Sequence, residues 1–423
     1  MLSAVLVVLS LALFANSVAT LSWMLHAWRT PENLAATRFP DPDGPGKLRF
    51  SLLVPARHEA AVLEHTLVGL LATQHPYVEI LVIVGHDDPD TAAVAEMVAL
   101  RAPDRLRVVV DHHDVKNKPK ALNNALAVCT GDVVGVFDAE DHVHPELLDH
   151  VDYAFRYTGA DVVQGGVQLV NFHSSWYALR NCLEYFFWFR SRLHLHANQG
   201  FIPLGGNTVF VRTPLLREVG GWDENCLAED CELGTRLSSR GARTVVAYNP
   251  ALVTREETPG SLYALFKQRC RWNQGFMQVY RKREWRHLPT FTQRILARYT
   301  LASPFLQAFS GIAMLLGIVV GLFVKVPDGI ALITFVPLVP TLATLAFELV
   351  GLHDFGRQFG VRVRFSHYLK LVVGSVFYNL MLTAAAARAV WREFTGRNNW
   401  ELTKHVGAHI PHVRPTEVVE VAS

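Results

Sequence analysis

The sequence predicts an α/β domain built on a mostly parallel sheet and flanked by transmembrane helices. Two observations predict this class. Strand-like and helix-like segments alternate along the central part of the chain, and long apolar stretches lie on either side of it. Alternating strands and helices are typical of a parallel sheet with helices on both faces. We therefore expect an N-terminal transmembrane helix (1–28), a cytosolic domain (47–290), a C-terminal transmembrane region of about three spans (299–391) and a tail (392–423).

The alternation begins soon after the first apolar stretch. Short runs of β-branched and apolar residues predict strands at 50–54, 79–84, 106–111 and 133–137. Helical spacing of apolar residues predicts helices at 60–73, 91–100 and 119–128. Ligands of such sheets bind beyond the carboxyl ends of the strands. A site is therefore expected among the segments that follow the strands, at 55–59, 85–90, 112–118 and 138–142.

The apolar stretches predict a multi-pass protein of the cell membrane with a cytoplasmic catalytic domain. Residues 2–25 are long enough to span a bilayer, and basic residues follow them from Arg29 onward. Three further apolar stretches lie near 299–324, 329–352 and 369–390. Four full spans would leave the tail outside, whereas the basic residues around the last span favour a cytoplasmic tail: Arg388, Arg392, Arg397 and Lys404. One span is therefore expected to be re-entrant or interfacial, with 337–340 as a candidate.

Two aromatic and basic stretches, 176–192 and 285–299, have two interpretations. Each is either a buried helix or a helix that lies in the membrane interface, where interleaved Trp, Phe and Arg are common.

The overall charge of the chain bears on its possible partners. Forty basic against 38 acidic residues give a formal charge of +2, so no nucleic-acid partner is expected. The five cysteines lack CxxC spacing and are expected to be reduced, mostly buried thiols.

A cluster of acids closes the fourth expected strand. Asp138, Glu140 and Asp141 lie within four residues, where their charges repel one another unless a cation sits among them. Mg²⁺ and Mn²⁺ prefer such oxygen ligands and bridge to diphosphate oxygens. The alternative is a solvated acidic turn that caps the helix expected after Pro145.

Two later segments carry groups suited to transfer chemistry. Glu229 and Asp230 follow the glycine-rich segment 205–207, and a carboxylate beside such a loop serves well as a general base. The alternative is that Asp230 caps the next helix. Gln268, Arg271 and Trp272 have the spacing of one helix face, where the guanidinium suits phosphate oxygens and the indole suits a sugar ring.

Three weaker signals remain. Asp87 and Asp88 follow the second expected strand and suit a ribose or base, although Asp90 is an equally good cap for the next helix. Lys118 leads into the third expected helix, where it either meets a phosphate or belongs to a solvated turn. The tail residues His405, His409 and His412 have a spacing that binds zinc on a helix, although Pro411 favours a solvated tail.

In this order, the segments resemble the membrane-bound branch of the family 2 glycosyltransferases, whose fold is called GT-A. The resemblance covers about residues 50–290 and ends in a QxxRW motif. The matching segments are 54–59 (VPARHE), 87–88 (DD), Lys118 with 122–123 (LN), 138–141 (DAED), 205–207 (GGN), 228–230 (AED) and 268–272 (QRCRW).

The resemblance implies a role for each matching residue. Donor binding falls to Arg57, Glu59, Asp87, Asp88, Lys118 and Arg271, and acceptor binding to Gln268, Trp272 and Glu229. Asp230 is the implied catalytic base. Asp138 and a partner acid would hold a Mg²⁺ or Mn²⁺ ion on the donor diphosphate. The usual DxD motif reads DAED here, which leaves Glu140 and Asp141 as alternatives, and Asp87 and Asp88 are equally undecided because the DGS turn common in the family is absent.

The expected activity is inverting transfer of a sugar from a UDP-sugar to a growing β-linked polysaccharide. The string HDDP is similar to ceramide glucosyltransferases, whereas DAED with QRCRW is similar to bacterial polysaccharide synthases. Addition of one sugar to a lipid is therefore the alternative. A transporter is disfavoured because Glu348 is the only clear acid in the expected spans. The partners implied are a nucleotide-sugar donor, a glycan or lipid acceptor, and membrane lipid.

Overall fold

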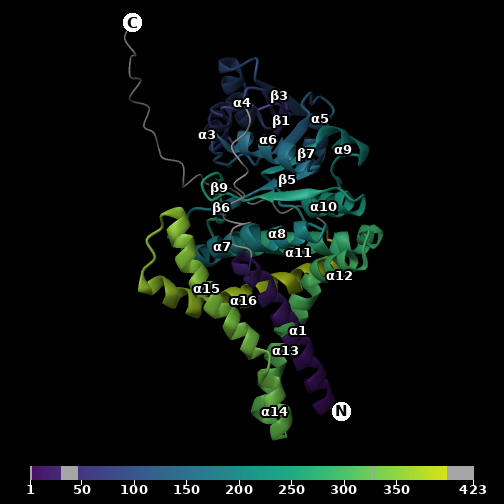
Figure 1. Ribbon diagram of the computed structural model, residues 1–423, viewed down its shortest axis with the longest axis vertical. Coiled ribbons are helices and arrows are strands. Elements are labelled where there is room, and N and C mark those ends of the chain that lie inside the picture. Colours follow the sequence, from purple (N-terminus) through teal and green to yellow (C-terminus); the bar gives the residue numbers. More distant parts are fainter. Residues whose placement is uncertain (1, 30–45, 325–326, 398–423) are drawn as a thin grey trace.

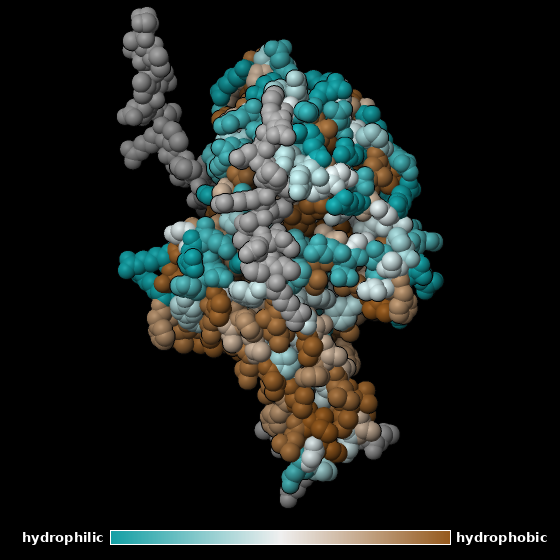
Figure 2. Space-filling view, viewed as in Figure 1, coloured by the Kyte–Doolittle hydropathy of each residue, from teal (hydrophilic) through white to brown (hydrophobic). Residues whose placement is uncertain are grey.

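The computed structural model describes residues 2–29, 46–324 and 327–397. An α/β domain stands above a set of long helices that extend away from it (Figure 1). The hydrophilic surface covers the domain, and the hydrophobic surface covers the helices beneath it (Figure 2). The tail histidines considered for zinc, together with Lys404, lie outside the described residues.

Within the described residues, seven strands form one sheet in the order β3-β2-β1-β4-β7-β5-β8. The first four strands are parallel, as predicted, with Leu53 opposite both Leu81 and Val136. The strand β7 is antiparallel to both of its neighbours, β4 and β5. The bounds are β1 Phe50–Ala56, β2 Val78–Gly85, β3 Leu106–Asp111, β4 Val133–Val136, β5 Val162–Gly165, β7 Val209–Arg212 and β8 Thr244–Ala247.

The helices between the parallel strands begin at residues that favour helix starts. Asp88 caps α4 (Pro89–Arg101) by accepting from the Thr91 amide, and proline occupies the first turn. Asn117 caps α5 (Lys118–Leu126) in the same way. The other two are α3 (Leu63–Leu71) and α6 (Leu147–Thr158). Apolar side chains from both faces of the sheet are buried under these and later helices, which forms two core layers.

The second half of the domain supplies a layer of helices between the sheet and the apolar helices. It includes α7 (Trp176–Phe187), which continues through the π-helix Trp188–Arg192 into α8 (Leu193–Asn198), and the 21-residue α11 (Leu262–Lys282). A small parallel pair, β6 (Val167–Leu169) and β9 (Thr254–Glu256), lies above α7 (Figure 1). The remaining elements are α9 (Thr213–Glu218), α10 (Glu229–Ser239), the 3-10 helix Glu284–His287 and α12 (Phe291–Leu301).

Three of the described helical segments are long and apolar enough to cross a membrane: Ser3–His26 in α1 (Leu2–Arg29), Asp328–Phe359 and Phe365–Phe394. A fourth is counted if α12 and α13 (Ser303–Phe323) form one span, although they meet at a bend of 52°. The stretch Asp328–Phe359 contains α14 (Asp328–Phe335) and α15 (Leu338–Phe359). The helix breaks briefly near Pro337, but Asp328–Phe359 still counts as one candidate span, and the sharp bend lies between α12 and α13.

The last helix, α16 (Phe365–Phe394), crosses beneath the layer of α7 and α11, whereas α1 and α13 extend away from the domain (Figure 1). It packs against α11, α13 and α7. The isolated acid Glu348 of α15 forms an ion pair of 2.5 Å with Arg180 of α7. This acid therefore joins the apolar helices to the catalytic domain.

The two aromatic stretches have different structures. In the first, Leu179, Cys182, Leu183 and Phe186 are buried between the domain and the apolar helices, so the buried interpretation is correct for α7. In the second, Trp285 is buried but α12 exposes Phe291 and Ile295. The interfacial interpretation therefore fits α12. All five cysteines are buried thiols that form no disulfide within the described parts of the chain.

Candidate active site

The carboxyl ends of the parallel strands meet along one edge of the sheet, and most of the predicted donor residues follow them. Arg57 follows β1, Asp87 follows β2, and Asp138 follows β4. Lys118 begins α5, which follows β3. The sheet therefore brings together segments that are up to about 80 residues apart in the chain, as a parallel topology predicts.

The first part of this edge is a paired basic and acidic surface. Arg57 donates to Asp87 at 3.0 Å, and Lys116 lies 3.4 Å from the same carboxylate. These two cations lower the pKa of Asp87, which remains well exposed. Glu59 lies in the turn after β1, where its amide donates to Thr91 Oγ1 at 3.2 Å.

Asp88 has a different environment from Asp87. Its carboxylate is buried and accepts from the backbone amide of His58 at 2.5 Å and from that of Thr91 at 3.3 Å. Asp88 therefore holds the turn after β1 against the start of α4, and it is the cap that the sequence assigned to Asp90. Of the two aspartates, Asp87 is exposed and Asp88 is buried, so Asp87 is the better placed of the two to contact a ligand.

Lys118 lies at the centre of the site and is not part of a solvated turn. Its ammonium group donates to the Asp138 carboxylate and, at 2.8 Å, to the Gly206 carbonyl oxygen. Burial opposes the charged form of this lysine. The carboxylates of Asp138, Glu229 and Asp230 outweigh that effect and raise its pKa. Lys118 therefore remains a cation among the site's acids.

The three acids after β4 divide into two kinds. Asp138 and Glu140 are partly exposed, whereas Asp141 is fully buried. The Asp141 carboxylate accepts a hydrogen bond from the backbone amide of Asp138 at 2.8 Å. It also accepts from the Asn207 side-chain amide at 2.9 and 3.0 Å. Burial, followed by the charges of Glu256 and Asp138, raises the pKa of Asp141.

This division fits a divalent cation bound mainly by substrate. No group of three or more His, Cys, Asp or Glu side chains within the described parts of the chain is arranged as a metal site. Mg²⁺ in nucleotide sites takes only one or two carboxylates from the protein, and phosphate oxygens and water supply the rest. Asp138 and Glu140 provide two accessible carboxylates at alternate positions, so they fit that role, and the buried Asp141 does not.

Glu229 and Asp230 begin α10 and face Lys118. Asp230 is not the N-cap, because Ala228 holds that position without a side-chain bond. Its carboxylate accepts from the Cys231 amide at 2.7 Å. A Cβ placed on Gly206 would lie 3.3 Å from Asp230 Oδ2 and 3.7 Å from Lys118 Nζ, so the absence of a side chain keeps this space open.

The two acids of α10 titrate as a pair. Burial is the largest cause that raises the pKa of each, and the charge of Asp230 further raises the pKa of Glu229. Lys118 and Arg271 oppose this rise at both carboxylates. A raised pKa in a site with a nearby cation suits a general base that works near neutral pH.

The helix α11 carries the predicted face of Gln268, Arg271 and Trp272. The guanidinium of Arg271 lies close enough to both acids of α10 for its charge to oppose the rise in their pKa. Trp272 is partly exposed, and its ring centre lies 6.4 Å from that of Tyr185 and 4.6 Å from the Arg269 guanidinium. The buried Gln268 Oε1 accepts no hydrogen bond from the described residues.

Three neighbouring contacts fix the position of α11. Gly275 allows a close approach, since a Cβ there would lie 2.6 Å from the Ala228 nitrogen. Arg269 donates to Glu184 at 2.7 Å and to Asn181 at 2.5 Å, which ties α11 to α7. The QxxRW helix is therefore held against both the start of α10 and the layer above the membrane helices.

Sequence reasoning did not assign roles to Asn207, Glu256, Tyr185 or Gly275. Asn207 joins two acids, because its amide donates to both Asp141 and Glu256. Tyr185 is half-buried, and the loss of water around its hydroxyl, followed by the charge of Glu256, raises its pKa. The GGN segment was a signal for Asn207, but nothing local in the sequence indicates the partners.

The fold and this arrangement define the chain as a glycosyltransferase of the GT-A type. Residues 45–275, more than half of the chain, match the family model described as "Glycosyltransferase like family 2". The chain therefore belongs to the family 2 glycosyltransferases, which confirms the resemblance noted in the sequence.

Two curated relatives illustrate the range of this family. The chain is 30% identical over 236 residues to the beta-monoglucosyldiacylglycerol synthase of Synechocystis sp.. It is 25% identical over 243 residues to the poly-beta-1,6-N-acetyl-D-glucosamine synthase of Staphylococcus aureus (strain COL). These matches cover 54% of this chain in both cases and 48% and 55% of the two relatives, so the chain spans about half the length of the curated relatives it matches.

Among solved structures, the fold is similar to that of the mannosyltransferase PcManGT from Pyrobaculum calidifontis, in complex with GDP-Man and Mn²⁺. The TM-score is 0.54 at 19% sequence identity, and the match covers 93% of this chain and 99% of that one. The likeness extends through nearly the whole chain, and it concerns the fold.

Proposed function

We propose that this chain is an inverting glycosyltransferase that moves a sugar from a nucleotide-sugar donor to an acceptor hydroxyl at the membrane surface. One observation carries the proposal: separate motifs converge on a single charged cluster formed by Lys118, Asp138, Asp230 and Arg271. Two cations and two carboxylates held together in this way suit a leaving diphosphate and an attacking hydroxyl.

The donor nucleotide belongs at the exposed end of β1 and β2. Arg57, Glu59 and Asp87 lie there, and a uridine diphosphate laid along the strand ends would bring its phosphates toward Lys118. Asp88 would act indirectly, because it holds the turn that presents Arg57 and Glu59. A Mg²⁺ or Mn²⁺ ion held by Asp138 and Glu140 would supply positive charge to the diphosphate.

The reaction is a single displacement. Asp230 takes the proton of the acceptor hydroxyl while that oxygen forms a bond to the anomeric carbon, and the bond from this carbon to the diphosphate oxygen breaks. The electron pair leaves with the nucleoside diphosphate. Arg271 and Lys118 stabilise the negative charge that develops on the diphosphate. Both cations lie within electrostatic range of Asp230, so they are close to the reacting groups.

The proposed acceptor is a growing β-linked polysaccharide. Its support is the partly exposed Trp272, which stands beside Tyr185 and offers a flat apolar surface to a sugar ring. Such a surface holds successive sugars without one fixed pattern of hydrogen bonds. Gln268 would add a hydrogen-bonding group on the same helix face, and Glu229 lies next to the base.

A second candidate is the addition of one sugar to a membrane lipid. Two observations favour it: the 30% identity to a monoglucosyldiacylglycerol synthase, and the packing of α11, which carries the QxxRW motif, against the apolar helix α16 (Figure 1). Three candidate spans among the described helices are also few for a polymer channel.

We further propose that α16 lies in the membrane interface. Its course beneath α7 and α11 supports this, and α1, α13 and the α14–α15 pair would then be the crossing segments (Figure 1). This arrangement leaves both the catalytic domain and the basic end of α16 in the cytoplasm, as expected from Arg388, Arg392 and Arg397.

The test uses the full chain in membranes with a panel of radiolabelled nucleotide sugars, including UDP-glucose, UDP-N-acetylglucosamine and GDP-mannose. Release of nucleoside diphosphate identifies the donor, and separation of products by size and solvent partition identifies the acceptor. Label in water-soluble or insoluble chains of several sugars is expected. A single sugar found only in the organic phase would select the glycolipid candidate, and no transfer with any donor would contradict the proposed activity.

A further inference from the structure

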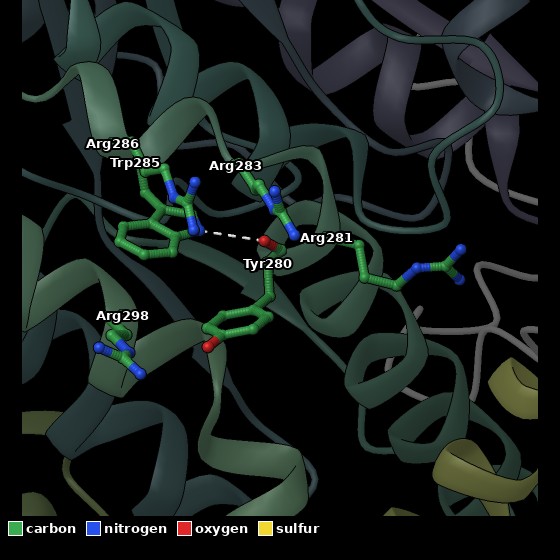
Figure 3. A pocket seen from close by; sticks show the side chains of 6 residues that line it. All are labelled: Tyr280, Arg281, Arg283, Trp285, Arg286 and Arg298. Carbon is green, nitrogen blue, oxygen red and sulfur yellow. Dashed lines mark hydrogen bonds between the residues drawn. The ribbon is translucent and has the colours of Figure 1, made fainter.

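A second concave site lies outside the catalytic centre, at the end of α11. It is a cavity of about 330 Å³, called here the arginine pocket, and it is lined by Tyr280, Arg281, Arg283, Trp285, Arg286 and Arg298. Figure 3 shows these side chains coming from the end of α11, the following 3-10 helix and α12. Four of the six lining residues are arginines, and none is acidic.

The charges of the pocket are only partly balanced by the protein. Arg281 pairs with Glu393 of α16, and the adjacent Lys282 pairs with Asp223. By contrast, no carboxylate within the described ranges lies within ion-pair distance of Arg283, Arg286 or Arg298. Guanidinium groups gathered without counter-ions repel one another, and a bound anion would relieve that repulsion.

The backbone at Arg283 supports a ligand-binding role for its side chain. This residue ends α11 in the left-handed conformation, with φ of 66°. Glycine is usual at such positions, because a side chain there costs about 1–2 kcal/mol. An arginine in this conformation is less stable than glycine would be, and Figure 3 shows its guanidinium directed toward Tyr280 in the pocket.

The location of the pocket indicates which kind of anion it would bind. Phe291, Ile295 and Arg298 follow one another on one exposed side of α12, so apolar side chains lie directly before a pocket arginine. The helix then bends into the apolar α13. The pocket therefore lies where the hydrophilic domain meets the hydrophobic helices (Figure 2), which is the level of lipid headgroups.

We propose that the arginine pocket binds the phosphate of an anionic membrane lipid. The guanidinium groups would hold the phosphate oxygens, and Phe291 and Ile295 would contact the adjoining acyl region. Trp285 and Tyr280 form a stacked wall, with ring centres 5.7 Å apart, that fixes one side of the cavity. The bound lipid would set the height and tilt of the catalytic domain on the membrane.

The experiment is titration of the full chain, purified in a non-ionic detergent, with phosphatidylglycerol, while bound lipid is counted by native mass spectrometry. The variant is Arg283→Gln, Arg286→Gln and Arg298→Gln combined. A matched control combines Arg101→Gln, Arg107→Gln and Arg240→Gln, which removes the same charge from exposed arginines paired elsewhere with Glu64, Glu79 and Glu218.

The pocket variant is expected to weaken phosphatidylglycerol binding by at least about tenfold, and the control is expected to match the unmodified protein. Lysine at the three pocket positions keeps the charge and should retain most of the affinity, which separates loss of charge from loss of folding. Equal binding by the pocket variant and its control would overturn the proposal. Equally tight binding of phosphatidylcholine, inorganic phosphate or an acidic peptide would overturn the assignment to an anionic lipid.

Discussion

The ammonium group of Lys118 donates to both the Asp138 carboxylate and the Gly206 carbonyl oxygen, so one cation joins the end of β4 to the loop beside Asp230. In the proposed site, Asp138 is also a ligand of the divalent cation. Lys118 and the metal ion therefore compete for the same carboxylate until the donor diphosphate arrives. This competition predicts that removal of Lys118 strengthens the binding of the divalent cation.

Lys118→Met is expected to tighten Mn²⁺ binding in the presence of UDP by roughly tenfold, because it removes both a competitor and a nearby positive charge. Sugar transfer should fall at the same time, since the leaving diphosphate loses a cation. Calorimetric titration with Mn²⁺ measures the first effect. Lys120→Met is the control, because within the described residues that ammonium donates to the Val115 carbonyl oxygen and to no carboxylate. Weaker Mn²⁺ binding in Lys118→Met would contradict the proposed competition.

The two candidates for the second metal ligand should behave in opposite ways. Glu140→Ala is expected to raise the Mn²⁺ concentration needed for activity and to leave thermal stability unchanged. Asp141→Ala leaves the buried amide of Asp138 without its acceptor and removes one of the two acceptors of the Asn207 amide, so it should lower the free energy of unfolding by about 2–3 kcal/mol. Thermal melts and Mn²⁺ titrations of activity distinguish them. Loss of stability in Glu140→Ala would reverse the assignment.

Chelation by EDTA should abolish transfer, and added Mn²⁺ or Mg²⁺ should restore it.

The paired acids of α10 predict the pH dependence of transfer. A base works only when deprotonated, and burial raises the pKa of both Glu229 and Asp230. Activity should therefore fall with decreasing pH at a value above the usual carboxyl range of about 4. Asp230 loses its proton first, because its charge raises the pKa of Glu229 and not the reverse. Glu229→Gln should therefore leave the acid limb of the kcat profile nearly in place. A limb that moves to lower pH would show that the charge of Glu229 does act on the base.

Gly275 offers a test of how α11 is positioned. A side chain there collides with the backbone of Ala228, so Gly275→Ala should displace the QxxRW helix from Asp230 and lower transfer. Ala228→Gly in the same chain is expected to restore part of the loss. Gly69→Ala is the matched control, because a Cβ at this helical position meets nothing within 4 Å. It should stabilise the protein by roughly 0.5–1 kcal/mol and leave transfer unchanged.

The parallel half of the sheet could be predicted because its strands are buried on both faces. Runs such as Phe50–Ala56 and Val78–Gly85 are almost continuously apolar, which is typical of parallel strands. The strands β5, β7 and β8 have only four residues each and carry little pattern of their own. Their order, with β7 antiparallel in the middle, depends on tertiary contacts that the local sequence does not encode.

In the site, too, some residues could be predicted from local sequence and others depend on tertiary contacts. Strand ends and helix faces predict from sequence pattern alone that Lys118 begins a helix, that Asp138 follows a strand and that Arg271 lies on a helix, and the structure has them there. The partners of Asn207 lie 66 and 49 residues away, at Asp141 and Glu256, so no local pattern indicates them. Burial also decides between neighbours that look alike in the sequence, as with Asp87 and Asp88.

Asp230→Asn keeps the shape of the side chain and its contact with the Cys231 amide but removes the proton acceptor. Transfer is expected to fall by about 10²–10⁴-fold, while binding of UDP stays near that of the unmodified protein. Asp90→Asn, in the first turn of α4, is the control. Equal loss of UDP binding and transfer in Asp230→Asn would give Asp230 a structural role.

The most direct test of single displacement by Asp230 is the anomeric configuration of the product. The full chain in membranes is supplied with the donor that the panel identifies, whose sugar is α-linked to the nucleoside diphosphate, and the first product is examined by proton NMR. A β-linked sugar, formed by the unmodified protein and not by Asp230→Asn, is the predicted result. An α-linked product would contradict the account, because a single attack by an activated hydroxyl inverts the anomeric carbon.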